Sequence, residues 1–189
     1  MDAPRRTGQH TYMFRLFIRL SVLCCLATVA SPEDARAQWA ACFTPAEDCE
    51  ARIIETIGHA RKTIRVQAYS FTSAPIAAAL VGAVHRGVDV RLIVGHAREK
   101  SGGHTRVDHV AVEGVVVLVD TPKGLMHDKI IIIDNETVVT GSYNFSASAA
   151  HRNVENVLIV NEMNVARRYG EHWRDRAAVS LPYEARTEH

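Results

Sequence analysis

The amino-acid sequence predicts an α/β fold in which helices flank a mixed or largely parallel β-sheet. Segments whose apolar residues recur at helical spacing alternate along the chain with short segments rich in Val and Ile, an order typical of α/β layering. Residues 38–189 number 152, which is enough for one domain with its own core and too few for two. The sequence shows no internal repeat and no low-complexity tract. We therefore expect a single domain.

The expected helices and strands follow one another in order. Three isoleucines stand at helical spacing within residues 50–62. The Ala-rich segment 75–86 begins with Pro and is followed by Gly87, as helices prefer. The small residues 146–150 are interpreted as a bend. The remaining pattern predicts strands at 63–69, 88–94, 115–119 and 154–160, a short helix at 106–112 and a closing helix at about 164–178.

The most informative segment begins at His127. His127 and Lys129 are two residues apart, so on a β-strand both side chains point to one face while that of Asp128 points away. The four isoleucines at 130–133 form a continuous apolar run. Such a run suits a strand buried on both faces, which leaves His127 at the mouth of that strand.

The chain then turns back toward this mouth. Residues 134–136 have the composition of a turn, and the β-branched segment 137–140 is expected to be the returning strand. Gly141 and Ser142 mark a break where the backbone can approach a ligand closely. Ser142 and Asn144 are therefore expected near the polar end of the first strand.

These side chains suit chemistry on a phosphodiester. Its negative charge increases in the transition state, so the site needs fixed cationic and amide donors as well as a nucleophile and an acid. Lys129 and Asn144 supply donors to the substrate, and Ser142 would orient either the phosphate or the partner groups. A two-metal nuclease requires a cluster of carboxylates to hold its metal ions. Asp134 and Glu155 are not clustered with other acidic residues in this sequence. The sequence therefore predicts neither a metal nor another cofactor.

The polar positions also form a recognisable pattern. His-x-Lys, four residues, Asp, six residues and Gly-Ser-x-Asn are matched without a gap by His127, Lys129, Asp134, Gly141, Ser142 and Asn144. This pattern resembles the signature of the phospholipase D superfamily. From about residue 47 onward, including segments 66–73 and 153–160, the chain is similar to the small, single-motif bacterial endonucleases of that superfamily.

The resemblance carries expectations about fold and mechanism. It implies a phospholipase D-like α/β/α sandwich and covalent catalysis, with the His127 imidazole as the nucleophile that forms a phosphohistidine. It also implies that Glu155 accepts a hydrogen bond from the other ring nitrogen and fixes the tautomer. Asp134 belongs to the pattern and is a candidate site residue, but a structural role in the turn is the favoured alternative.

A second imidazole is needed, because one imidazole cannot attack phosphorus and protonate the leaving oxygen in the same step. The sequence contains a single His-x-Lys. The partner is therefore expected to be His127 of another subunit, in a homodimer whose composite active site lies on a two-fold axis. Other histidines, such as His59, His85 and His172, are expected on helix surfaces without a role.

The N-terminus has the features of a signal peptide. Arginines precede an apolar run at residues 20–30, and a small-x-small sequence ends at Ala37. We expect residues 1–37 to be removed, residues 38–189 to form the nuclease domain, and the protein to be periplasmic or secreted. A retained membrane anchor is the alternative, although the apolar run is shorter than the roughly 20 residues that a spanning helix needs.

Two cysteines remain after Ala37. In an oxidising compartment Cys42 and Cys49 could pair, and a disulfide is the favoured interpretation. A zinc site is the alternative, but no second Cys/His pair at ligand spacing accompanies them.

Net charge does not identify the substrate. Five of the 22 basic and three of the 21 acidic residues precede Gln38, so the remainder carries a net charge of −1 with histidine neutral. A polyanion would need a local patch, and the best candidate is residues 96–109. A solvated loop, offset by Glu99 and Asp108, is an equal alternative. The cations of this segment are Arg98, Lys100, His104 and Arg106.

Three functions are compatible with these observations. The leading prediction is a metal-independent, non-specific endonuclease on DNA, with RNA left open as a substrate. A phospholipase D or phosphatidyl-transfer enzyme shares the chemistry. Lipid-active relatives usually carry two motifs on a longer chain, however, and no amphipathic apolar surface segment follows the signal. The third function is a non-catalytic nucleic-acid-binding module, which the complete motif argues against.

Overall fold

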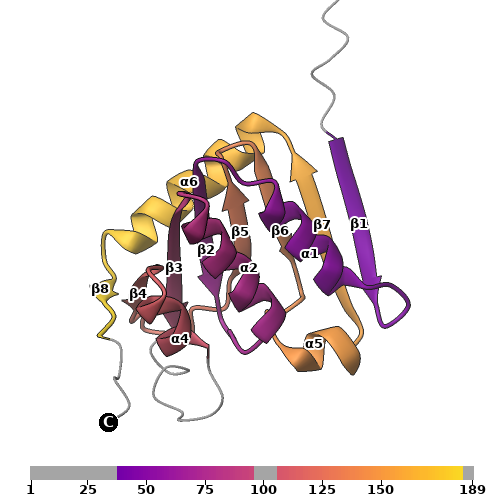
Figure 1. Ribbon diagram of the computed structural model, residues 1–189, viewed down its shortest axis with the longest axis horizontal. Helices are drawn as coiled ribbons and strands as arrows, with labels where there is room; N and C mark the ends of the chain where they lie inside the picture. Colours follow the sequence, from indigo (N-terminus) through magenta and orange to yellow (C-terminus); the bar gives the residue numbers. More distant parts are fainter. Residues whose placement is uncertain (1–37, 96–105, 185–189) are drawn as a thin grey trace, which may run out of the picture. The chain divides into compact units, whose positions relative to one another are not determined.

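An eight-stranded β-sheet organises the part of the chain that the computed structural model describes, residues 38–95 and 106–184 (Figure 1). The predicted signal peptide and most of the predicted basic patch lie outside these residues. The strand order is β1-β7-β6-β5-β2-β3-β4-β8. In chain order the strands are β1 (Gln38–Thr44), β2 (Thr63–Ala68), β3 (Asp89–Gly95), β4 (Val116–Asp120), β5 (Lys129–Ile133), β6 (Thr137–Gly141), β7 (Glu155–Asn161) and β8 (Leu181–Pro182).

Helices cover both faces of the sheet, which confirms the predicted α/β layering. Figure 1 shows α1, α2 and α4 over one face and α6 across the other, with α5 at the lower end of β6 and β7. None of the helices within the described ranges combines the length and apolar composition needed to cross a bilayer. The helices are α1 (Cys49–Gly58), α2 (Ala74–His85), α4 (Val107–Val112), α5 (Ala147–His151) and α6 (Met163–Ala177).

The sheet is mixed, as predicted, but it is not largely parallel. Among the described strands, β2, β3 and β4 pair in parallel, and the five other pairings are antiparallel. The difference follows from the connections. The parallel strands are joined through helices, whereas β5 and β6 are joined by a short turn, which only antiparallel neighbours can accommodate.

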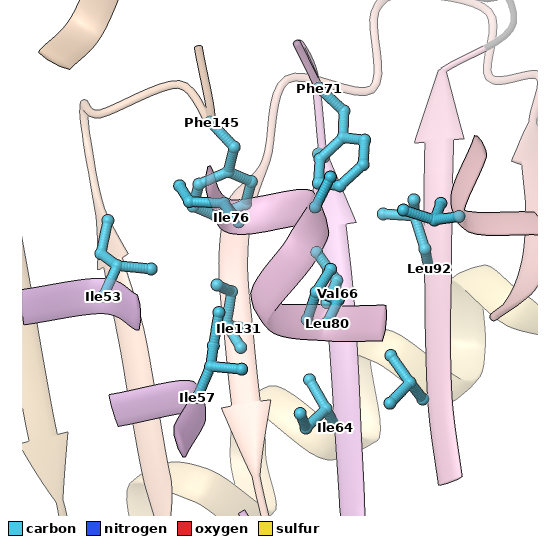
Figure 2. Packing of buried hydrophobic residues seen from close by; sticks show 14 of the residues in the cluster. Ile53, Ile57, Ile64, Val66, Phe71, Ile76, Leu80, Leu92, Ile131 and Phe145 are labelled. Atoms are coloured by element: carbon cyan, nitrogen blue, oxygen red, sulfur yellow. The ribbon is translucent and has the colours of Figure 1, made fainter. Parts of the chain in front are cut away.

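The isoleucine run of β5 places this strand at the centre of the fold. Ile131 and Ile133 pack into the larger core cluster, and Ile130 and Ile132 pack beneath Ala166 and Trp173 of α6. Figure 2 shows side chains of α1 and α2 pointing onto the central strands in the larger cluster. Because both faces of β5 are buried, packing also fixes the position of Lys129, the polar residue at the start of the strand.

The sequence did not predict β1, α5 or β8. Strand β1 lies at the sheet edge and pairs antiparallel with β7 from Gln38↔Asn161 to Thr44↔Glu155. The Cys42–Cys49 disulfide links it to α1, which confirms the predicted pairing. In β1 both aromatic residues are exposed, Trp39 at 69% and Phe43 at 55%. This inverts the usual strand pattern, so the strand was not recognisable from hydrophobic alternation.

Candidate active site

The predicted site residues gather at one end of the sheet, where β5 and β7 begin and β2 and β6 end. Lys129 is the first residue of β5 and pairs with Ala68, the last residue of β2. Gly141 at the end of β6 pairs with Val157, two residues into β7. Strand pairing therefore brings together segments that are widely separated in the sequence.

His127 and Lys129 are in direct contact. The Lys129 Nζ lies 3.0 Å from Nδ1 and 3.3 Å from Nε2 of the His127 ring, and it donates to the His127 carbonyl at 2.6 Å. Nζ lies at nearly equal distances from both ring nitrogens, so the ammonium group contacts the imidazole as a whole and is not directed at the lone pair of one nitrogen. The two side chains share one face, as their spacing predicted, and the imidazole is exposed at the strand mouth.

Tyr69 completes this group and was missed by the sequence analysis. Its ring centroid lies 4.4 Å from that of His127, with the planes inclined by 54°. The Lys129 Nζ lies 5.1 Å from the same tyrosine ring, within the range of a cation–π contact. Tyr69 directly follows Ala68, so knowledge of the β2–β5 register would have identified it.

Lys129 is buried, with 8% of its surface exposed. Desolvation is the largest influence and lowers the pKa of its ammonium group, while the charges of Asp128 and Glu155 oppose that shift. A cation in a site with little water interacts strongly with a charged substrate group. Lys129 is thus placed to stabilise negative charge on a phosphate that reaches His127.

Ser142 and Glu155 form a second polar group at this end. The Ser142 Oγ donates to Glu155 Oε2 at 2.5 Å and accepts from the Asn156 backbone N–H at 3.0 Å. The other oxygen of Glu155 accepts from Asn153 Nδ2 at 2.8 Å. The expected bond from His127 to Glu155 is not formed here, and the two carboxylate oxygens accept from Ser142 and Asn153 instead. Glu155 acts on the catalytic pair through its charge.

The close approach of β6 to β7 requires glycine at position 141. Gly141 has φ of 151°, and a Cβ there would lie 2.2 Å from the Asn156 carbonyl oxygen. That carbonyl accepts from the backbone N–H groups of Ser142 and Tyr143. The break predicted at Gly141-Ser142 is therefore the point where the end of β6 approaches β7 closely, and this approach positions Ser142.

Asn144 lies at the same end, half-buried in the loop between β6 and α5. Its carbonyl accepts from the Ser146 backbone N–H at 2.7 Å. Its side-chain Oδ1 is buried and has no hydrogen-bond partner among the described residues. Buried polar atoms are normally paired, so this acceptor oxygen remains available to a donor from outside the described residues.

Asp134 lies at the opposite end of β5, so its inclusion among the catalytic residues was wrong. Its carboxylate accepts from the backbone N–H groups of Arg61, Lys62 and Thr63 at 2.9, 2.8 and 2.8 Å. Asp134 and Asn135 have φ of 54° and 59°, which identifies a tight hairpin turn. The structural alternative holds: Asp134 fastens this turn to the loop before β2.

Comparison with known proteins agrees with this geometry. Residues 53–176 match the family model described as "Cardiolipin synthase, PLD-like domain". The chain is 36% identical over 146 residues to a phospholipase D of Rickettsia conorii, covering 77% of this chain and 72% of that protein. It is 27% identical over 123 residues to the mitochondrial cardiolipin hydrolase of Xenopus tropicalis, covering 65% of this chain and 58% of that protein.

A solved structure shows the same fold. Nuc, a phospholipase D family member from Salmonella typhimurium, has a TM-score of 0.75 and 32% identity, covering 79% of this chain and 99% of that chain. The eight-stranded mixed sheet and the family match agree with the resemblance read from the motif. The chain therefore belongs to the phospholipase D superfamily of phosphodiester hydrolases, in its bacterial Nuc-like branch.

Proposed function

We propose that this enzyme is a metal-independent endonuclease that cleaves DNA through a covalent phosphohistidine. The observation that carries the proposal is the His127–Lys129 contact at the exposed mouth of β5, where Nζ lies 3.0 Å from the ring. It pairs a nucleophile with a cation in the way that phosphoryl transfer demands. Ser142 and Asn144 supply a hydroxyl and an amide at the same end of the sheet.

The reaction has two steps. In the first, a ring nitrogen of His127 forms a bond to phosphorus while the bond from phosphorus to the leaving oxygen breaks, and a second imidazole protonates that oxygen. In the second, the same imidazole removes a proton from water, which attacks phosphorus and releases His127. Lys129 stabilises the charge on the non-bridging oxygens in both steps.

DNA is favoured over lipid by the resemblance of the single motif to that of the small endonucleases and by the match to Nuc. The sequence has one His-x-Lys, like the small endonucleases it resembles, and it matches Nuc over nearly the whole of that protein. The alternative, a phospholipase or cardiolipin-cleaving enzyme, is favoured by the names of its relatives, a phospholipase D and a cardiolipin hydrolase. Both functions use the same reacting groups, so only a substrate assay separates them.

That assay is a side-by-side measurement with chelator present. Purified residues 38–189 are expected to nick plasmid DNA in EDTA at the rate seen without it, because every charge-stabilising role is assigned to side chains. Phosphatidylcholine vesicles in the same buffer are expected to release no choline. Activity that disappears in EDTA and returns with magnesium would contradict the metal-independent mechanism. Choline release without DNA cleavage would show that the enzyme is a phospholipase and not a nuclease.

The active species in this proposal is a homodimer that shares two copies of His127. An exposed apolar surface supports it: Trp39 and Phe43 of β1 share a sheet face with Leu158 of β7, because Trp39 pairs with Val160 and Ala41 with Leu158. This face continues to Asn156, next to Glu155. A second copy seated here would bury apolar area and extend to the active-site end.

Replacing both aromatic residues tests the dimer. The double variant Trp39→Ser, Phe43→Ser is expected to raise the dimer dissociation constant at least about tenfold, since large apolar anchors dominate interfaces. Its specific activity is expected to fall on dilution at enzyme concentrations where the wild type is still fully active. Val112→Ser, which changes an exposed apolar side chain of α4, is the control. Light scattering during turnover that finds a fully active monomer would refute the shared-histidine mechanism.

Export to an oxidising compartment is the remaining part of the proposal. The Cys42–Cys49 disulfide supports it, because such bonds persist outside the reducing cytosol. N-terminal sequencing of protein recovered from the cell envelope, with Gln38 expected as the first residue, is the corresponding measurement.

A further inference from the structure

A cavity of about 380 Å³ lies beside the catalytic pair, between α6 and the strands β5 and β6. We call it the α6 pocket. The helix side contributes Arg168, Tyr169 and His172, and the sheet side includes His127, Lys129 and Thr140. Because the pocket borders both His127 and Lys129, a group that fills it lies next to the phosphate being cleaved.

His172 lines this pocket and contacts Asp128 there, although the sequence assigned it no role. Its Nε2 lies 3.0 Å from Asp128 Oδ2, and the same oxygen accepts from Gln67 Nε2 at 3.1 Å. Gln67 is fully buried in β2, so the contact joins α6 to the core of the sheet. Asp128 also lines the pocket, but its Oδ2 is occupied by these two side chains.

Arg168 lies one helical turn before His172, so both side chains are on the same face of α6. It is exposed and contacts Glu171 at 3.3 Å, whereas Arg167 contacts the same carboxylate at 2.7 Å. Exposed ion pairs of this kind contribute little to stability. Arg168 can therefore leave Glu171, which keeps Arg167, and bind a phosphate with two parallel hydrogen bonds.

We propose that the α6 pocket binds the nucleotide next to the scissile phosphodiester. Arg168 and His172 contact its phosphate, and the Tyr169 ring lies against its base or sugar, as aromatic side chains do in single-strand sites. The volume is at the lower end of the range for small-ligand sites, which suits one nucleotide and no more. This inference rests on the proposed nuclease function and assigns α6 a part in substrate binding.

The test compares two substrates and two variants. Arg168→Ala is expected to raise KM for single-stranded oligothymidylate about tenfold or more, the scale of a lost charged contact. Its loss on bis(p-nitrophenyl) phosphate, which has no flanking nucleotide, is expected to be at least fivefold smaller, about twofold or less. The slope of log KM against log salt concentration should also decrease, by the amount expected when one phosphate contact is lost. Arg167→Ala removes an equal charge from the same carboxylate and is expected to match the wild type on both substrates.

Several outcomes would overturn the inference. Equal losses for Arg168→Ala on the two substrates would indicate an effect on the reacting groups, and no loss on either would show that the pocket is not used. An Arg167→Ala defect as large as that of Arg168→Ala would indicate general attraction instead of a site. If the wild type hydrolyses bis(p-nitrophenyl) phosphate but neither oligothymidylate nor plasmid DNA, the proposed nuclease function is wrong. The proposed binding of a flanking nucleotide in the α6 pocket is then wrong as well.

Discussion

His127→Ala is expected to lower kcat on DNA by roughly 10³-fold or more, the scale seen when an enzyme nucleophile is removed. The variant should remain folded, because the imidazole is exposed at the mouth of β5 and its contacts are with Lys129 and Tyr69 at the surface end of the strand. Circular dichroism and thermal unfolding should match the wild type within about 0.5 kcal/mol.

A matched histidine provides the control. His151→Ala removes an exposed imidazole at the end of α5 and is expected to leave kcat unchanged. Wild-type enzyme quenched during turnover with alkaline detergent, which preserves the phosphorus–nitrogen bond, should carry a DNA fragment joined through phosphorus to His127, and the His127→Ala protein should carry none. Appreciable nuclease activity in a folded His127→Ala protein would place the nucleophile elsewhere.

Asp134→Ala is expected to have the largest effect on stability. The change removes a charged acceptor from three backbone N–H groups, and hydrogen bonds to charged groups each contribute about 1.5–3 kcal/mol when buried. Because the site is partly open to water, we expect a loss of roughly 3 kcal/mol in the free energy of unfolding, measured with urea. Glu136→Ala, which removes an exposed carboxylate from the same turn, should change it by less than about 0.5 kcal/mol.

The same residue sets part of the acid sensitivity. Desolvation, the largest influence, raises the pKa of Asp134, but the three backbone hydrogen bonds and Lys62 together lower it below its ordinary value of 3.8. A lowered pKa stabilises the fold fully above pH 3.8, and this contribution is lost as the pH falls through the folded-state value. Asp134→Ala should therefore flatten the acid limb of stability against pH, and an unchanged limb would contradict the role assigned to these bonds.

The hairpin and its polar mouth were predictable because their signals are local. The Ile130–Ile133 run identified a strand buried on both faces, and the two-residue spacing placed His127 and Lys129 together. Neither inference needed knowledge of any other element.

The surroundings of this pair were not predictable, because strand pairing brings them from distant positions. Tyr69 reaches His127 only through the β2–β5 register, and Ser142 reaches Glu155 only through the pairing of β6 with β7. Helix α5 has five residues, mostly Ala and Ser, too few for a helical pattern to be recognised. His172 is exposed on α6, as predicted, but its contact with Asp128, 44 positions away, could not be read from the local pattern.

Strand β1 connects the active site to the redox state of its surroundings. The Thr44 hydroxyl at its end donates to the Asn153 carbonyl and accepts from the Glu155 backbone N–H, so the start of β7 is aligned by β1. The Cys42–Cys49 bond anchors that strand to α1, and this anchor forms only where thiols are oxidised. In a newly made chain both thiols are reduced, so β1 is not yet linked to α1. Glu155 would then be aligned by an edge strand that only hydrogen bonds and packing hold in place. We therefore expect the alignment of the catalytic end to depend on whether these thiols are oxidised when the protein folds.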